Sequence, residues 1–189
     1  MFKISFNSPI ILGFSITCAL ALISNNLTAG FSNDFIFSTY RAPLNDPMMY
    51  VRLIGHVFGH ADWDHFIGNM MLILVVGPLL EEKYGSFDIF ILILITAILT
   101  GLANNLMFAH IQLLGASGVA FALILLSSFT SIKEGAVPMT FILVTLIYIV
   151  GEIYDGLFMV NNISNVTHII GGATGATLGY LMNKYRVKT

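Results

Sequence analysis

A serine between two glycines is the feature of this sequence best suited to chemistry. Ser117 lies in the stretch Gly115-Ala116-Ser117-Gly118, at the start of an apolar run. A serine hydroxyl becomes an effective nucleophile when a neighbouring base accepts its proton. The same small residues also suit close packing between membrane helices. Ser117 alone therefore leaves both interpretations open, and the choice depends on finding a base.

His168 is the candidate base, because it heads a glycine-rich face of the last apolar stretch. Gly171, Gly175 and Gly179 recur every four residues, so this face of a helix carries almost no side chains. Another backbone can approach such a face closely. Packing explains the glycines but not the imidazole, since ionisable groups in membrane spans are rare and usually line functional cavities. We therefore expect His168 to lie beside Ser117.

A second polar cluster lies where a long connection meets the second apolar stretch. It contains Arg52, His56, His60, His65 and Asn69. His65 and Asn69 are four residues apart and share a helix face, which would point both side chains into the bundle. Three neighbouring histidines also suit zinc or copper, although no cysteine and no carboxylate at a typical spacing accompanies them. We expect His56 and His60 to hold the connection to the helix end by hydrogen bonds.

The elements that must position these side chains are membrane helices. Of the 189 residues, 57% are hydrophobic and 10% are charged, unlike an ordinary soluble domain. The net charge of -2 and the lack of a basic cluster argue against a nucleic-acid partner. Little chain lies outside the apolar runs, so we expect one domain over residues 1–189 in a lipid bilayer. The single cysteine, Cys18, has no disulfide partner and fits a small core residue.

Six apolar stretches approach the ~20 residues that a helix needs to cross ~30 Å of hydrocarbon. They lie near residues 8–24, 65–80, 87–108, 115–131, 136–154 and 164–183. This pattern predicts an all-α membrane protein with six transmembrane helices. The first stretch also resembles a cleavable signal peptide, because Lys3 precedes it and Ala19-Leu20-Ala21 resembles a cleavage site.

The distribution of basic residues predicts the orientation of the spans. With a cytoplasmic N-terminus and alternating spans, six of the eight lysine and arginine residues fall inside, and Arg41 and Arg52 fall outside. Both termini are then cytoplasmic. The inside set is Lys3, Lys83, Lys133, Lys184, Arg186 and Lys188.

The connection from about Asn25 to Asp64 is long and rich in aromatic residues and methionine. Such content predicts a structured outer loop in the membrane interface. The apolar run after Ser117 is short, roughly 15 residues or ~22 Å. If Lys133 marks the cytoplasmic surface, Ser117 lies at depth, where non-helical backbone must be buried or line a wet cavity. We therefore expect Ser117 to open onto an outward-facing, water-filled cavity.

Taken together, these motifs resemble the rhomboid family of intramembrane serine proteases over nearly the full length. The family's second-helix pattern is matched by His60, His65 and Asn69. Its serine motif is matched by Gly115-Ala116-Ser117-Gly118, and its last-helix histidine by His168. Together with the signature at the end of the second helix, described next, these are four motifs in the family's order, and they form a specific signal.

Three further positions bear on the resemblance: the end of the second helix, the end of the first loop, and the fourth residue after the serine. Glu81, Gly85 and Ser86 match the signature that closes the second helix, and Arg52 matches the arginine near the end of the first loop. The chain departs from many bacterial members at Phe121, where they carry tyrosine. The ring that packs against the histidine is kept, so we expect activity to remain.

The resemblance implies a serine endopeptidase that cleaves the transmembrane segments of single-span membrane proteins, without a metal or another cofactor. Ser117 and His168 would form the catalytic dyad, because no carboxylate lies in the last span. His65 and Asn69 would stabilise the oxyanion, together with the backbone N–H of Ser117. Supporting residues are expected at Gly115, Gly118, His60 and Asn165. The two glycines would let the last helix approach the serine, and Asn165 would mainly pack.

The resemblance further implies a six-transmembrane-helix rhomboid bundle with a long structured first outer loop. A multi-pass protein of the bacterial inner membrane, with both termini cytoplasmic, is the expected setting. Two alternatives remain. One is an inactive rhomboid-like protein that binds membrane clients without cutting them, although such a binder has no need of the complete set of site residues. The other is a small transporter or metal-binding membrane protein that uses His56, His60 and His65.

Overall fold

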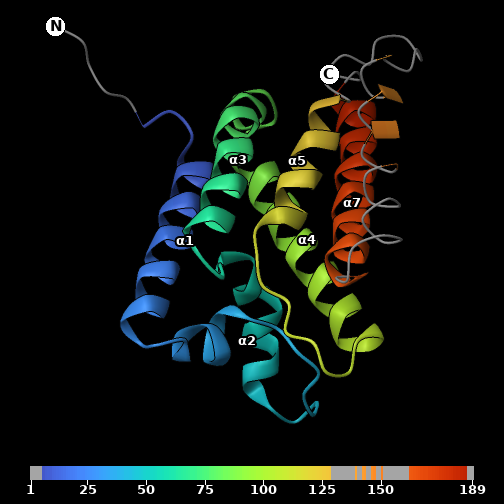
Figure 1. Ribbon diagram of the computed structural model, residues 1–189. Helices are drawn as coiled ribbons and strands as arrows, with labels where there is room; N and C mark the ends of the chain where they lie inside the picture. The colour runs from blue at the N-terminus through green and yellow to red at the C-terminus, as the bar shows by residue number, and fades with distance from the viewer. Residues whose placement is uncertain are drawn as a thin grey trace, which may run out of the picture.

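The computed structural model describes residues 6–128 and 162–186, with single positions 139, 142, 143, 146, 147 and 150 between them. The described elements are α1 (Pro9–Leu27), the π-helix η1 (Asn33–Phe37), α2 (Pro47–Gly55), the 3₁₀ helix η2 (His56–Phe58), α3 (Trp63–Tyr84), α4 (Ser86–Met107), α5 (Ser117–Ser128) and α7 (Asn162–Arg186). The long helices form a bundle, with α2 at its lower end in Figure 1.

The helices agree with the apolar stretches of the sequence wherever the structure describes them. The stretches expected near 8–24, 65–80, 87–108 and 164–183 are helical, and the stretch near 115–131 is helical as far as its described part extends. The stretch expected at 136–154 falls outside the described residues, apart from isolated positions.

Three of the described helices, α1, α3 and α4, are long and apolar enough to cross a membrane. α3 and α4 have 22 residues each, which corresponds to about 33 Å of helix. This length matches the hydrocarbon thickness of a bilayer. The chain is therefore an integral membrane protein, as its composition predicts.

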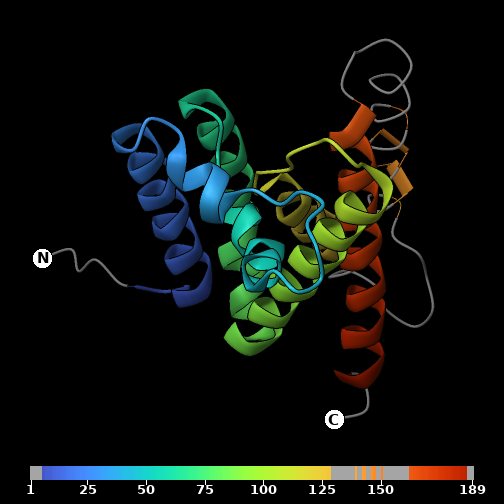
Figure 2. The ribbon, with the colours of Figure 1, turned by 90° about the horizontal axis from the view of Figure 1, so that it is seen from below.

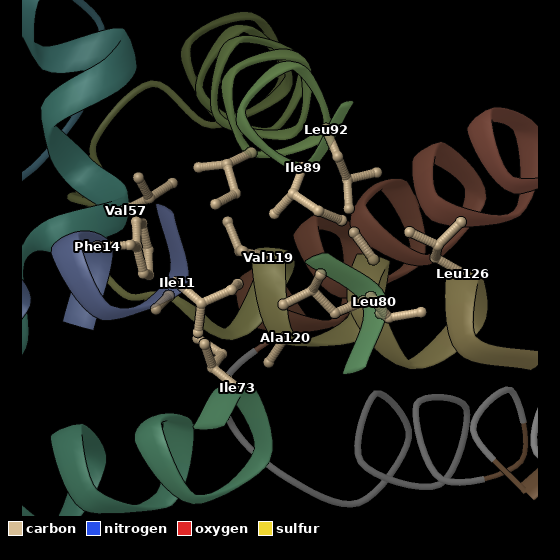
Figure 3. Close-up of a cluster of buried hydrophobic side chains, with 14 of the residues drawn as sticks. Ile11, Phe14, Val57, Ile73, Leu80, Ile89, Leu92, Val119, Ala120 and Leu126 are labelled. Atoms are coloured by element: carbon tan, nitrogen blue, oxygen red, sulfur yellow. The ribbon is translucent and has the colours of Figure 1, made fainter. Parts of the chain in front are cut away.

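The hydrophobic core forms around α5, the short helix that begins with Ser117. Val119, Leu123 and Leu126 of α5 are completely buried. Side chains from α1, α3 and α4 converge on this helix, as Figure 3 shows for Ile11 and Ile73 among others. In Figure 1, α5 starts part-way along the bundle, whereas α7 continues below that start. The bundle therefore holds the beginning of α5 in its interior.

The segment between α1 and α3 covers the lower end of the bundle, and Figure 2 shows it crossing this end from α1 towards α4. Arg41 joins it to the end of α4, where its Nε donates to the carbonyl of Asn105 at 2.8 Å and its Nη2 to that of Leu106. A cation at this position also complements the negative end of the helix dipole. Arg52 is buried, pairs with Asp46 and lies over the ring of Tyr40 at 4.5 Å.

At the opposite end, the carboxylate of Glu81 joins α3 to α1. Its two oxygens accept the backbone N–H groups of Ile10 and Ile11 at 3.0 and 2.9 Å, and one also accepts the hydroxyl of Ser86 at 2.7 Å. The first N–H groups of a helix have no partner within the helix. Glu81 therefore caps α1 from another helix, and it is only 3% exposed.

We predict that Glu81→Ala lowers the free energy of unfolding by about 1–3 kcal/mol, because buried donors lose their acceptor. Thermal denaturation of the purified protein in detergent would measure the change. Glu82→Ala is the matched control, since Glu82 is the neighbouring carboxylate and is exposed. Equal stability of the two variants would contradict the capping role.

Candidate active site

Ser117 and His168 are in hydrogen-bonding contact, although 51 residues separate them in sequence. Ser117 is the first residue of α5, and His168 lies near the start of α7. The distance from the Ser117 Oγ to the His168 Nε2 is 2.8 Å. When Nε2 is unprotonated, it accepts the proton of the hydroxyl. This is the geometry of a nucleophile and its general base.

Two glycines of α7 make this contact geometrically feasible. A Cβ at Gly171 would lie 2.3 Å from the carbonyl oxygen of Gly118, and one at Gly175 would lie 2.0 Å from that of Ala122. Real Cβ atoms essentially never come this close to backbone. The close approach predicted from the glycine spacing is therefore confirmed at these two positions.

The imidazole of His168 is also in contact with Phe121, one turn into α5. The two ring centroids are 4.7 Å apart, at an interplanar angle of 48°. An aromatic ring at this position therefore packs against the histidine, as the sequence predicts. Asn165 precedes His168 by one turn of α7 and is buried.

His65 also lies close to the serine motif. Gly115 has a φ of +133°, a conformation that favours glycine, and a Cβ there would lie 2.9 Å from the His65 Cε1 and 3.0 Å from its Nε2. That same Cβ position is 3.8 Å from the Ser117 Oγ. The ring of His65 thus lies directly against the backbone that leads into α5.

Asn69 follows His65 by one turn of α3, and its side-chain amide is a hydrogen-bond donor. It is 6% exposed. Its Nδ2 has no hydrogen-bond partner among the described residues. A buried donor without a partner is costly, and active sites are a common place to find one.

The structure corrects the expected role of Gly115. The sequence predicts that Gly115 and Gly118 both make room for the last helix. Instead, the space at Gly115 is taken by His65, and a Cβ at Gly118 would contact Thr100 of α4 at 3.3 Å before the Thr167 carbonyl of α7 at 3.7 Å. The glycines that admit α7 belong to α7 itself.

His56 and His60 both make hydrogen bonds to nearby backbone carbonyls. The Nδ1 of His56 faces the carbonyls of Arg52 and Leu53 at 3.3 and 3.1 Å, and its Nε2 faces the hydroxyl of Thr100 at 3.2 Å. Its backbone carbonyl accepts the N–H of Gly115 at 2.9 Å. The expected hydrogen-bonded link between the connection and the helix ends is therefore present at His56.

His60 has a similar local arrangement. Its Nδ1 lies 3.1 Å from the carbonyl of Phe58. Its ring meets that of His65 edge-on at 5.2 Å and that of Phe66 at 5.4 Å. Within the described part of the chain, no three His, Cys, Asp or Glu side chains form a group suited to a metal ion.

Thr39 and Asn104 hold the extended segment at 111–113, which precedes the serine. The sequence did not predict either residue. Thr39 and Leu113 exchange both backbone hydrogen bonds, at 2.8 and 2.9 Å. The Nδ2 of Asn104 donates to the carbonyls of Thr39 and Ile111, both at 3.1 Å. The available signal was a pair of asparagines, Asn104 and Asn105, inside the end of an apolar stretch.

Comparison with known proteins identifies the family of this chain. A model of the Rhomboid domain matches residues 47–185, which is most of the chain. The chain belongs to the rhomboid family. The resemblance seen in the sequence motifs is therefore confirmed.

The relatives of this rhomboid come from plants and bacteria. Rhomboid-like protein 11, chloroplastic, of Arabidopsis thaliana is 24% identical over 75% of this chain and 55% of its own length. Rhomboid protease GlpG of Serratia proteamaculans is 27% identical over 75% and 52%. Rhomboid protease GlpG of Haemophilus influenzae is 24% identical over 89% and 88%. The rhomboid thus spans about half of the first two relatives and most of the third.

We predict that Gly175→Ala destabilises this rhomboid by about 1–3 kcal/mol, because the added methyl meets the backbone of α5. Gly13→Ala is the matched control, since a Cβ on this helical glycine meets nothing within 4 Å. The control should be neutral or up to about 1 kcal/mol more stable, because alanine favours helix. Thermal denaturation in detergent would compare them, and similar effects of both variants would contradict the close contact.

The stability of this rhomboid should fall as the pH is lowered from about 6.5 to about 4. Burial lowers the pKa of His56 to about 4, against the opposing effect of its carbonyl partners. Burial and the charge of His65 also lower the pKa of His60 to about 4. In this range the unfolded chain binds protons that the folded chain does not. The stabilising contribution of these two histidines is therefore fully present above the pKa of the unfolded chain, and it is lost on acidification.

Thermal denaturation across this pH range would measure that dependence. His60→Phe replaces one titrating ring with an apolar ring and should reduce the slope. An unchanged slope in this variant would exclude a contribution from His60.

Proposed function

We propose that this rhomboid is an intramembrane serine endopeptidase with Ser117 as nucleophile and His168 as general base. The observation that carries the proposal is the 2.8 Å contact between the Ser117 Oγ and the His168 Nε2. Two of its relatives carry the name rhomboid protease. The membrane helices and the family make a membrane-embedded protein substrate the natural target.

The first half of the reaction forms an acyl-enzyme. The Ser117 Oγ attacks the carbonyl carbon of the scissile peptide bond while the His168 Nε2 takes the hydroxyl proton. The tetrahedral intermediate carries a negative oxygen. When it collapses, the carbon–nitrogen bond breaks, and His168 returns the proton to the leaving amine.

The second half releases the acyl group by hydrolysis. A water molecule gives a proton to His168 and attacks the ester carbonyl. When the second intermediate collapses, the bond from the carbonyl carbon to the Ser117 Oγ breaks, the acid product leaves, and His168 returns the proton to the Oγ. Water must therefore reach the site, and we propose that Ser117 opens onto an outward-facing wet cavity. The two residues act as a dyad, without a metal or another cofactor.

His65 and Asn69 are the proposed oxyanion donors, together with the Ser117 backbone N–H. The His65 ring abuts Gly115, two residues before the nucleophile. The Asn69 Nδ2 is buried and has no partner in the described part of the site. Such a donor is already desolvated and is free to bond a developing negative charge, which typically contributes 10²–10³ in rate. Gly115, Gly118, His60 and Asn165 support these groups.

The proposed substrates are single-span membrane proteins, cut within a transmembrane segment. A peptide bond inside a helix is shielded, so the substrate must unwind near the cut. Residues that weaken a helix, such as glycine and proline, lower this cost. We expect cleavage to favour segments that carry them.

The complete architecture we propose is one rhomboid domain over residues 1–189, with six spans and a long outer loop between α1 and α3. We place both termini in the cytoplasm of a bacterial cell, with the protein in the inner membrane. The described basic residues support this orientation. Lys83 and Lys184 lie in the last turns of α3 and α7, which meet where Tyr84 donates to Asn183 at 3.3 Å. Arg41 lies at the opposite end of the bundle.

We predict that Ser117→Ala and His168→Ala each reduce cleavage of a model transmembrane substrate by roughly 10⁴-fold or more, because the nucleophile and its base act as a unit. The assay uses purified protein in detergent or liposomes. Ser128→Ala is the matched control, since Ser128 is buried on the same helix and bonds only the Ile124 carbonyl in the described structure.

Cleavage that persists in Ser117→Ala would refute the proposal. Labelling with a fluorophosphonate tests the alternative of an inactive binder of membrane clients. A protease is labelled at Ser117, whereas a binder without a working nucleophile stays unlabelled.

A further inference from the structure

Asn33 is a buried polar residue in η1, and its side chain contacts His60, which lies between η2 and α3. It is 8% exposed. Its Nδ2 donates to the backbone carbonyl of His60 at 3.0 Å, and its backbone N–H donates to the Oδ1 of Asn25 at 3.2 Å. Its own carbonyl accepts the hydroxyl of Ser38 at 2.8 Å. A carbonyl oxygen can only accept a hydrogen bond, so the contact with His60 fixes which way the Asn33 amide points.

The backbone around this bond has almost no free space. A Cβ at Gly59 would lie 2.0 Å from the Phe37 carbonyl oxygen, and one at Gly55 would lie 2.3 Å from that of Ile36. The π-helix η1 and the η2 turn are thus pressed together, backbone against backbone. The Asn33 bond is at the end of this contact, where the chain leaves η2 for α3.

From His60 the contacts lead directly to the proposed oxyanion site. The His60 ring is completely buried and meets the His65 ring edge-on at 5.2 Å. The His65 ring in turn abuts Gly115, with 2.9 Å from its Cε1 to a Cβ placed there. The carboxylate of Asp62 accepts the backbone N–H of His65 at 2.8 Å and so caps the start of α3.

The two sides of His65 are therefore held by different means. Asp62 fixes the backbone at the start of α3, but it leaves the side-chain torsions of His65 free. The imidazole contacts both the His60 ring and the backbone at Gly115. Because Gly115 has no side chain, the His60 ring is the side-chain group of this pair that can hold the imidazole.

We propose that Asn33 is a positioning residue for the oxyanion site, which it fixes by holding the His60 carbonyl and thereby the edge-on pair of imidazoles of His60 and His65. This inference rests on the proposed function. Asn33 does not touch the substrate. A preorganised donor stabilises the transition state more than the bound substrate, so loosening it lowers kcat and leaves KM nearly unchanged.

The first experiment compares Asn33→Ala with Asn26→Ala in the purified full chain. Asn26 is the matched control, because it lies at the nearby end of α1 and is exposed. We expect kcat for a model transmembrane substrate to fall roughly 10- to 100-fold in Asn33→Ala, by displacement of a catalytic group. Asn26→Ala should match the wild type. An Asn33→Ala variant with wild-type kcat, or with a loss confined to KM, would overturn the proposal.

The second experiment separates positioning from a general loss of structure. Asn33→Ala and His65→Ala are measured singly and together, by the rate constant for fluorophosphonate labelling of Ser117. If Asn33 acts through His65, its loss has no further effect once His65 is gone, so the double variant labels as fast as His65→Ala. Losses that multiply would show that Asn33 acts independently, and would refute the proposal.

Two measurements complete the design. If Asn33→Ala does not fold, Asn33→Leu replaces it, because leucine has the same branched shape as asparagine and no donor for the His60 carbonyl. Wild type and Ser117→Ala are assayed in parallel. A wild type that neither cleaves nor labels would refute the proposed protease, whereas a working wild type with multiplying losses would refute only the role of Asn33.

Discussion

The backbone contact between α5 and α7 is the constraint on which the candidate site depends. A hydroxyl and an imidazole on separate helices meet at 2.8 Å only when the two helix axes lie unusually close. Gly171 and Gly175 make this possible, because any side chain there would strike a carbonyl of α5. A bilayer offers no hydrophobic force between helices, so packing of this kind is what holds them together. The same glycines thus serve assembly and bring together the proposed dyad.

The other half of the site depends on the chain outside the long helices. The segment that enters α5 is tied to Thr39 by two backbone hydrogen bonds and to the His56 carbonyl through Gly115. The ring of His65 occupies the space that a side chain at Gly115 would need. Two parts of the structure therefore position the serine. One is α7. The other is the start of α3, together with the segment between α1 and α3.

Sequence patterns predicted the features that depend on local spacing. The apolar stretches and the glycine repeat each follow from helix geometry, so the described helices and the α5–α7 contact agree with them. The partners of Gly115 were not predictable, because a glycine does not indicate which neighbour fills its space. Asn33 and Thr39 were missed for another reason. They are ordinary polar residues in an irregular connection, and their side chains bond partners 27 and 66 residues away.

The Glu81 carboxylate has a consequence for the order in which the chain is assembled. Its partners in α1 precede it by 71 and 70 residues, so α1 leaves the ribosome well before its cap has been synthesised. During that interval the first amide groups of α1 are left to water and lipid headgroups. When α3 joins α1, the contact of Glu81 with α1 closes a loop of the chain. This loop contains the whole segment between the two helices. The Glu81 contact therefore links the two helices that flank this segment, at the ends opposite to it.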